Sequence, residues 1–536
     1  MHRYRQWLAA AALFAAPALA LAGKADPPAP LDARAMAARI GQRLAERWQA
    51  RGVRPAPVAG DAEFLRRAYL DLTGKTPPAA EVRRFLADPS PDKRGRLIEK
   101  LLASPGYVTH LSNVYRALLL SEADADQRLA FLKGGFEAWL HQQFAANAPY
   151  DRMVRDLLTV PVAGGGSRRA FFIETMGGGE APSPIGFFLA KQGKPENLAA
   201  ASARLFLGAR IECAQCHDHP FQKWTREQFW GQAAFFAGIQ QQDPNNPFGG
   251  VRELSDRREL GIPGTDKVVQ ASFLDGTEPQ WRYKVGARVT LADWITSPEN
   301  PYFAKAAVNR VWAYLLGTGL VEPVDDLNPT NLPSHPELLD ELARQFAANK
   351  FDLKWLLRSI TLSKAYQLTS AGGTAGEDRR LFARMPVRRL TGEQLFDSFA
   401  QATGYRDPTP ASQRAFAFGS ARGQFIAKFT ASGDKPTDFH MSIPQALAMM
   451  NNPLVQRAID PDGTGTVAAL ADLPGMTTAG KVEALFLAVL SRRPTPQELD
   501  RFVKHVDSGG PKKDPKRALA DVMWALLNST EFILNH

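Results

Sequence analysis

Short amphipathic segments that end at glycine run through this sequence and restrict the folds open to it. In 'DAEFLRRAYLDLTG', Phe64, Leu65 and Leu72 recur at helical spacing, and Gly74 is the expected stop. The same pattern ends at Gly208 in 'KPENLAAASARLFLG' and at Gly317 in 'FAKAAVNRVWAYLLG'. Most of the chain repeats this arrangement of cap, apolar stripe and stop. The sequence therefore predicts a mainly α fold.

The chain is too long, at 536 residues, for one ordinary hydrophobic core. Residues 241–289 are loop-rich and contain one short strand-like run at Val268–Phe273. Helical patterns occupy both sides of this segment. We expect two helical domains, residues 35–240 and 290–536, joined by a loop-rich segment with minor β structure.

Residues 1–22 have the three parts of a secretory signal peptide. A basic start precedes an apolar run from Trp7, and small residues place cleavage near Ala20 or Ala22. The alternative is an uncleaved anchor helix, but the apolar run is short for a span and Pro17 interrupts it. No later stretch is long and apolar enough to cross a bilayer. We expect a periplasmic or secreted protein without a transmembrane span in its mature chain.

The net charge of +10 comes from basic residues that are interspersed with acidic ones. No long single-sign block and no nucleic-acid-binding motif is present, so we expect no nucleic-acid partner. Neither a serine–histidine–aspartate triad nor a glycosidase carboxylate pair can be read from spacing alone. The sequence does not decide whether the protein is an enzyme.

The stretch Cys213–Trp224, 'CAQCHDHPFQKW', contains both cysteines of the chain. Chance rarely produces C-x-x-C-H from two cysteines and nine histidines in a chain of this length. The motif is typical of c-type haem attachment. Cys213 and Cys216 would form thioethers with the porphyrin, and His217 would be the proximal iron ligand.

Two other interpretations of the motif remain open. Zinc would take Cys213 and Cys216 with His217 or His219, although structural zinc sites usually bring their second ligand pair from a distance. A local disulfide between the cysteines would suit an exported chain, in which free thiols rarely persist. A helix precedes the motif rather than the strand typical of redox-active pairs.

The second domain contains a further group of polar residues that suits a cation or a sugar. The candidates are Asn309, Arg310, Asp325, Asp326 and His335. A structural explanation competes with this one: a buried pair between Arg310 and an aspartate, and a capping box from Ser334 and Glu337 at the next helix.

Long stretches of the chain resemble two known families. 'ARLFLGARIECAQCHDHPFQKWTREQFWGQAAFFAG' and 'DAEFLRRAYLDLTGKTPPAAEVRRFLADPSPDKRGRLIEKLLASPGY' resemble domain-of-unknown-function family 1549, which is described as planctomycete cytochrome-like. 'LADWITSPENPYFAKAAVNRVWAYLLGTGLVEPVDDLNPTNLPSHPELLDELARQF' and the closing 'WALLNSTEFILNH' resemble family 1553. The resemblance extends over residues 35–536. It implies an exported two-domain protein in this order and brings no established reaction.

One departure from family 1549/1553 proteins concerns 'KFTASGDKPTDFHMSIPQAL', where relatives often carry extra cysteines. This chain has His440 and Met441 there instead. Each residue type is an ordinary haem ligand, so both are candidates for the distal position; their alternative roles are a surface histidine and a core methionine.

The sequence favours an exported monohaem c-type protein that passes electrons to an unknown redox partner, coupled to oxidation of a substrate or an extracellular polymer. Two other classes compete with it. One is a haem-free secreted or envelope binding protein with a Cys213–Cys216 staple. The other is an enzyme or cation site built on Asp325, Asp326 and His335.

Overall fold

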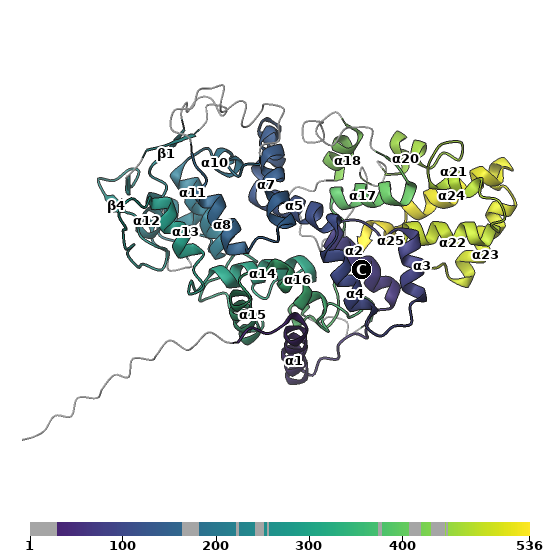
Figure 1. Cartoon of the computed structure of the whole chain (residues 1–536), viewed down its shortest axis with the longest axis horizontal. Coiled ribbons are helices and arrows are strands. Elements are labelled where there is room, and N and C mark those ends of the chain that lie inside the picture. Colours follow the sequence, from purple (N-terminus) through teal and green to yellow (C-terminus); the bar gives the residue numbers. More distant parts are fainter. Residues whose placement is uncertain are drawn as a thin grey trace, which may run out of the picture.

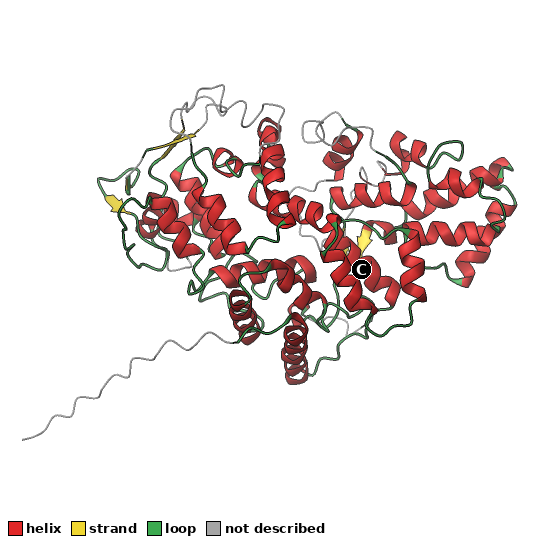
Figure 2. Ribbon diagram, viewed as in Figure 1, coloured by secondary structure: helices red, strands yellow, loops and turns green. Residues whose placement is uncertain are grey.

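The computed structural model describes residues 29–162, 182–220, 224–241, 251–254, 257–372, 378–406, 420–429, 445 and 449–536. Within these residues the chain is mostly helical, with three small two-stranded antiparallel sheets (Figure 2). The predicted mainly α fold is therefore confirmed. None of the helices described is long and apolar enough to span a membrane. The predicted signal peptide, residues 1–22, lies outside the described residues.

The larger hydrophobic core is built by helices from residue 33 to residue 361. They are α1 (Ala33–Arg51), α2 (Asp61–Thr73), α3 (Ala79–Ala87), α4 (Lys93–Leu102), α5 (Pro105–Leu119), α6 (Glu122–Ala125), α7 (Lys133–Ala145), α8 (Tyr150–Thr159), α10 (Gly186–Ala190), α11 (Pro195–Ser202), α12 (Arg226–Ala234), α13 (Ala287–Ile295), α14 (Phe303–Leu316), α15 (Pro336–Ala348) and α16 (Leu353–Thr361). Helices on both sides of residues 241–289 share this core, so hydrophobic packing crosses the segment. The division of the chain into two domains at that segment stays a prediction.

A second core lies at the C-terminal end of the chain. Its helices are α17 (Gly392–Thr403), α18 (Ala421–Phe429), α20 (Pro453–Ala458), α21 (Thr466–Ala471), α22 (Thr478–Val489), α23 (Pro496–Asp507), α24 (Pro515–Leu527) and α25 (Thr530–Ile533). Leu70 of α2 belongs to this second core, whereas Phe64 and Leu72 of the same helix belong to the first. Figure 1 shows α2 in the middle of the molecule, between the two groups of helices.

Glycine ends the helices where the sequence predicts it. Gly74, Gly208 and Gly317 are left-handed C-caps with φ of 74°, 62° and 73°. The turn before Gly208 is π-helical, Ala203–Leu207. A Cβ on Gly208 would lie 2.8 Å from Leu327 Cδ1, so close packing also requires glycine there.

The strands are short. β1 (Ile239–Gln241) pairs with β2 (Val251–Glu253), and β3 (Glu259–Gly261) pairs with β4 (Val268–Gln270), which lies in the predicted strand-like run. β5 (Arg388–Arg389) pairs with β6 (Leu534–Asn535) at the end of the chain. This last pair attaches the C-terminal residues to the junction of the two cores.

Candidate functional site

The Cys motif forms a surface turn directly after the glycine stop at Gly208. A short 3-10 helix, Glu212–Gln215, holds Cys213, and Cys216 follows it. Ile211 and Ala214 are buried and anchor the turn, whereas both cysteines are exposed free thiols. The structure therefore presents two accessible thiols on one turn and contains no disulfide between them.

The rest of the motif fastens this turn to helix α12. The side-chain oxygen Oδ1 of Asp218 accepts a hydrogen bond from the backbone N–H of Arg226 at 2.7 Å, in the first turn of α12. Trp230 Nε1 donates to the Gln215 carbonyl at 3.1 Å. Trp224 is buried, and its carbonyl accepts from the backbone N–H of His219 at 2.8 Å. Asp218 and Trp224 thus hold the turn in place, a role that spacing alone does not reveal.

In the exposed imidazole of His217, one ring nitrogen forms a hydrogen bond and the other forms none with the described residues. Its Nδ1 lies 2.8 Å from the Asp218 carbonyl oxygen. A carbonyl oxygen only accepts, so Nδ1 is the donor in this contact, and in the neutral ring Nε2 then carries the lone pair. A backbone carbonyl on one ring nitrogen is the usual way that proteins orient a ligating histidine.

Among the described residues, no group of three or more histidine, cysteine, aspartate or glutamate side chains is placed to hold a metal ion. The geometry therefore does not support a zinc site made by Cys213, Cys216, His217 and His219. His440 and Met441, the candidate distal ligands, lie outside the described residues.

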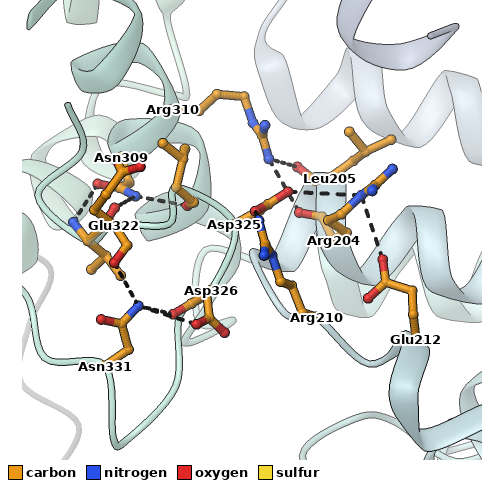
Figure 3. A network of polar contacts seen from close by, with 12 residues as sticks. Arg204, Leu205, Arg210, Glu212, Asn309, Arg310, Glu322, Asp325, Asp326 and Asn331 are labelled. Atoms are coloured by element: carbon orange, nitrogen blue, oxygen red, sulfur yellow. Dashed lines mark hydrogen bonds and ion pairs between the residues drawn. The ribbon is translucent and has the colours of Figure 1, made fainter. Parts of the chain in front are cut away.

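Asp325 lies beside the residues that lead into the Cys motif. Its carboxylate pairs with Arg210 at 2.7 Å and with Arg204 at 3.9 Å, and Arg204 also lies 3.8 Å from Glu212 (Figure 3). The backbone N–H of Leu327 donates to the Gly208 carbonyl at 2.7 Å. The segment around Asp325 therefore packs on the chain that positions the Cys turn.

The side chains of Asn309 and Arg310 form hydrogen bonds with backbone groups. Asn309 is fully buried, and its Nδ2 donates to the carbonyls of Val321 and Val324 at 2.9 Å each while its Oδ1 accepts from the Val321 N–H (Figure 3). Arg310 Nη2 donates to the carbonyls of Arg204 and Leu205. The predicted pair between Arg310 and an aspartate is not formed among the described residues: Nη2 donates to backbone oxygens, and the buried Nε has no hydrogen-bond partner there.

Asp326 and His335 have different partners from Asp325. The Asp326 carboxylate accepts from Asn328 at 2.9 Å. His335 is buried with its Nδ1 3.0 Å from Ser334 Oγ, and burial lowers its pKa to about 4. Helix α15 begins at Pro336 with His335 as N-cap and without a side-chain cap. The predicted capping box of Ser334 and Glu337 is therefore wrong, because the Ser334 hydroxyl donates to the Leu320 carbonyl instead.

The densest buried polar cluster was not predicted by sequence reasoning. Helix α2 buries Arg66, Arg67 and Asp71 inside the molecule. Asp71 accepts from Arg388 in β5 and from Asn535 in β6, each at 2.8 Å. A clue was present in 'FLRRAYLDL', where three charged residues interrupt an otherwise apolar helix.

Two protein-family models match parts of this chain. Residues 39–241 match the model described as PSCyt2, protein of unknown function (DUF1549), and residues 287–424 match PSD1, protein of unknown function (DUF1553). The chain therefore carries a DUF1549 region followed by a DUF1553 region. The order is the one that the resemblance implied. No curated protein and no solved structure matched the chain.

The family names assign no reaction, but the matched ranges show which contacts join the two family regions. The Cys turn belongs to the DUF1549 region, and Asp325 and Arg388 belong to the DUF1553 region. The ion pair between Arg210 and Asp325, and that between Asp71 and Arg388, therefore join the two family regions. The Cys turn is supported by both regions rather than by DUF1549 alone.

A large groove lies between the two regions. It measures about 2310 Å³ and is lined by residues of α5, α7, α17 and α18. Figure 1 shows where these helices lie. A smaller cavity of about 240 Å³ lies beside Met385 and Pro386. Neither cavity is lined by a residue of the Cys motif.

Charged side chains cross the groove wall. Arg116 of α5 is buried and forms ion pairs with Asp124, Glu137 and Glu393 at 2.6, 2.9 and 3.0 Å. Burial raises the pKa of the Glu137 carboxyl despite the nearby guanidinium. The arrangement ties α5, α6 and α7 to α17.

Proposed function

We propose that this chain is an exported c-type monohaem protein that accepts and passes electrons. Cys213 and Cys216 are the attachment points, and His217 is the proximal ligand. At each cysteine the S–H would add across one vinyl group, forming a C–S bond and passing the thiol hydrogen to the other vinyl carbon. No oxidant is consumed in this step. The bound group would supply one-electron exchange at its iron.

The observation that carries the proposal is the donor set of the turn. Cys213 and Cys216 are free and exposed, and the adjacent His217 keeps Nε2 open because its Nδ1 is held by a carbonyl. A disulfide staple needs no histidine, and a zinc site needs a further ligand within reach.

The surface position of the turn bears on the electron partner. Because the motif residues line neither cavity, a group attached to them would lie at this surface turn, where a separate redox partner could reach it. Export through residues 1–22 belongs to the proposal, since c-type attachment in bacteria takes place outside the cytoplasm.

The test is expression of the full chain in a host with c-type maturation machinery. We expect a red protein with a sharp reduced α-band, and haem that stays on the chain after denaturation. The Cys213→Ser/Cys216→Ser double variant should lose covalent haem, and His217→Ala should change or abolish the spectrum. His141→Ala, which removes an exposed histidine on α7, is the matched control and should leave the spectrum unchanged.

Contrary outcomes are equally clear. A colourless protein from a host that matures another c-type cytochrome in the same culture overturns the proposal. If that colourless protein also has no titratable thiol, Cys213 and Cys216 form a staple and the binding-protein alternative is favoured. N-terminal sequencing of the exported chain should locate cleavage near Ala20 or Ala22.

A further inference from the structure

The groove between the two family regions is too large for an ordinary small-molecule site. Small-molecule pockets usually enclose about 300–1,000 Å³, whereas this groove measures about 2310 Å³ and is open along its length between α7 and α18. An extended occupant fits this space better than a single metabolite.

Each carboxylate in the groove wall forms an ion pair with a basic side chain. Arg116 pairs with Asp124, Glu137 and Glu393, and Arg422 pairs with Asp397 at 3.1 Å. On the floor, Arg388 pairs with Asp71. These ion pairs connect α5, α6, α7, α17 and α18, so they brace the walls.

Three further basic side chains line the groove without a hydrogen-bond or ion-pair partner in the described part of the chain. The side chains of Lys75, Arg406 and Lys428 have neither a hydrogen bond nor an ion pair within the part of the chain that the structure describes. Arg406 and Lys428 are exposed, and Lys75 is half-buried. Eight lysine and arginine residues line the groove against five aspartate and glutamate residues, so its lining carries net positive charge and attracts anions.

The groove also offers uncharged hydrogen-bonding groups. Thr109, Asn113, Gln142 and Gln401 line it, and in the described structure their side chains make no hydrogen bond to protein. On the floor, Arg388 Nε and Asn535 Oδ1 are a buried donor and a buried acceptor without partners, in residues 7% and 4% exposed. Hydroxyl groups, which both donate and accept, complement such a surface.

The aromatic residues of the groove are not arranged to stack on bases. Tyr314 and Phe429 are buried or bonded within the walls, and Tyr405 packs its ring against Phe396. Single-stranded nucleic acids are usually held by exposed aromatic rings together with dense basic charge. The sparse cations and abundant amides of this groove suit a hydroxylated chain with spaced charges.

We propose that the groove between α5/α7 and α17/α18 binds an anionic polysaccharide, with Lys75, Arg406 and Lys428 contacting its carboxylate or sulfate groups. The amides and hydroxyls of the groove bind the sugar hydroxyls. The inference does not depend on haem, because no residue of the Cys turn lines this groove.

The test is calorimetric titration of the full exported chain with three soluble probes at low and high salt. The probes are oligogalacturonate for carboxylate, dextran sulfate for sulfate, and unmodified dextran as the neutral chain. We expect at least one anionic probe to bind, more weakly at high salt, and the neutral chain to bind far less. The variant Lys75→Gln/Arg406→Gln/Lys428→Gln should weaken binding about tenfold or more, as expected for the loss of three exposed ionic contacts.

The matched control is Arg83→Gln/Arg501→Gln/Lys512→Gln, which removes the same charge from exposed residues outside the groove. It should retain the affinity of the parent chain. Equal weakening in both triple variants would show attraction to net charge alone and overturn the proposal. Absence of binding to every probe would also overturn it, and so would tighter binding of oligo(dT) than of either anionic glycan, which would make the groove a nucleic-acid site.

Discussion

Arg388 Nη2 lies 2.8 Å from each carboxylate oxygen of Asp71, and the two side chains are 9% and 1% exposed. Tyr366 and Asn535 donate to the same carboxylate, each at 2.8 Å. Four segments that are far apart in the sequence therefore meet at Asp71. The junction of the DUF1549 and DUF1553 regions is a buried, hydrogen-bonded ion pair.

The first prediction concerns this pair. Asp71→Ala leaves the Arg388 guanidinium buried without its anion, so we expect the free energy of unfolding to fall by about 3–5 kcal/mol. Urea denaturation followed by circular dichroism measures the change. The double variant Asp71→Leu/Arg388→Met should lose less than Asp71→Ala, because it removes both charges. A loss below about 1 kcal/mol in Asp71→Ala would contradict the role assigned to the pair.

The second prediction concerns the attachment of the C-terminal residues. Arg66 is buried and donates to the carbonyls of Val489 at 3.1 Å and Phe532 at 2.8 Å. Lysine keeps the charge but cannot donate in two directions from a planar fork. We expect Arg66→Lys to destabilise the chain by about 2 kcal/mol, measured as a lower thermal midpoint. Arg501→Lys, at an exposed position on α23, is the control and should leave the midpoint unchanged.

The third prediction tests whether Asn309 is structural. Asn309→Ala removes its hydrogen bonds to Val321 and Val324 and leaves those backbone groups buried, so we expect a loss of about 2–4 kcal/mol. Lys305→Ala on the same helix breaks only a surface pair with Asp340 and should cost less than about 1 kcal/mol. Urea midpoints of the two variants give the comparison. Equal stabilities would remove the structural explanation for Asn309.

The fourth prediction concerns acid sensitivity. Burial lowers the pKa of His110 to about 4, and likewise that of His335. Each folded pKa lies below the ordinary value of 6.5, so the unfolded chain binds protons first as the pH falls. Stability is then fully present above pH 6.5 and declines towards pH 4, by up to on the order of 3 kcal/mol for each histidine.

Urea unfolding at several pH values between 4 and 7 measures this slope. The variant His110→Gln/His335→Gln should show a shallower decline than the parent chain, whatever its stability at pH 7. A parent chain with constant stability over this range would contradict neutral burial of the two histidines.

The sequence located helix ends well where the signal lies within a few residues of the end. Gly74, Gly208 and Gly317 end their helices because a left-handed residue is needed at each end and glycine adopts it without strain. Helix starts were less certain, because several residue types can serve there. Helix α15, for example, uses His335 rather than Ser334 as its N-cap.

For the candidate site, too, the sequence revealed short-range features and missed long-range partners. The Cys turn is a short-range motif, so its residues could be named from spacing, and the structure adds that Asp218 holds the turn to α12. The groups around Asn309 and Asp325 were identified as polar clusters, but spacing could not tell that the amide holds backbone or that Asp325 pairs with Arg210. Partners about a hundred residues away leave no periodic signal.

By itself, the sequence determined the helical segments, their glycine ends and the C-x-x-C-H turn, since each depends on residues within a few positions of one another. Only the tertiary structure decided that Arg66 and Asp71 lie inside the molecule and that Arg388 and Asn535 meet them there. It also decided where the groove lies. A charged residue on a helix is usually solvated, and only the chain that folds over it determines whether it is buried and which group compensates its charge.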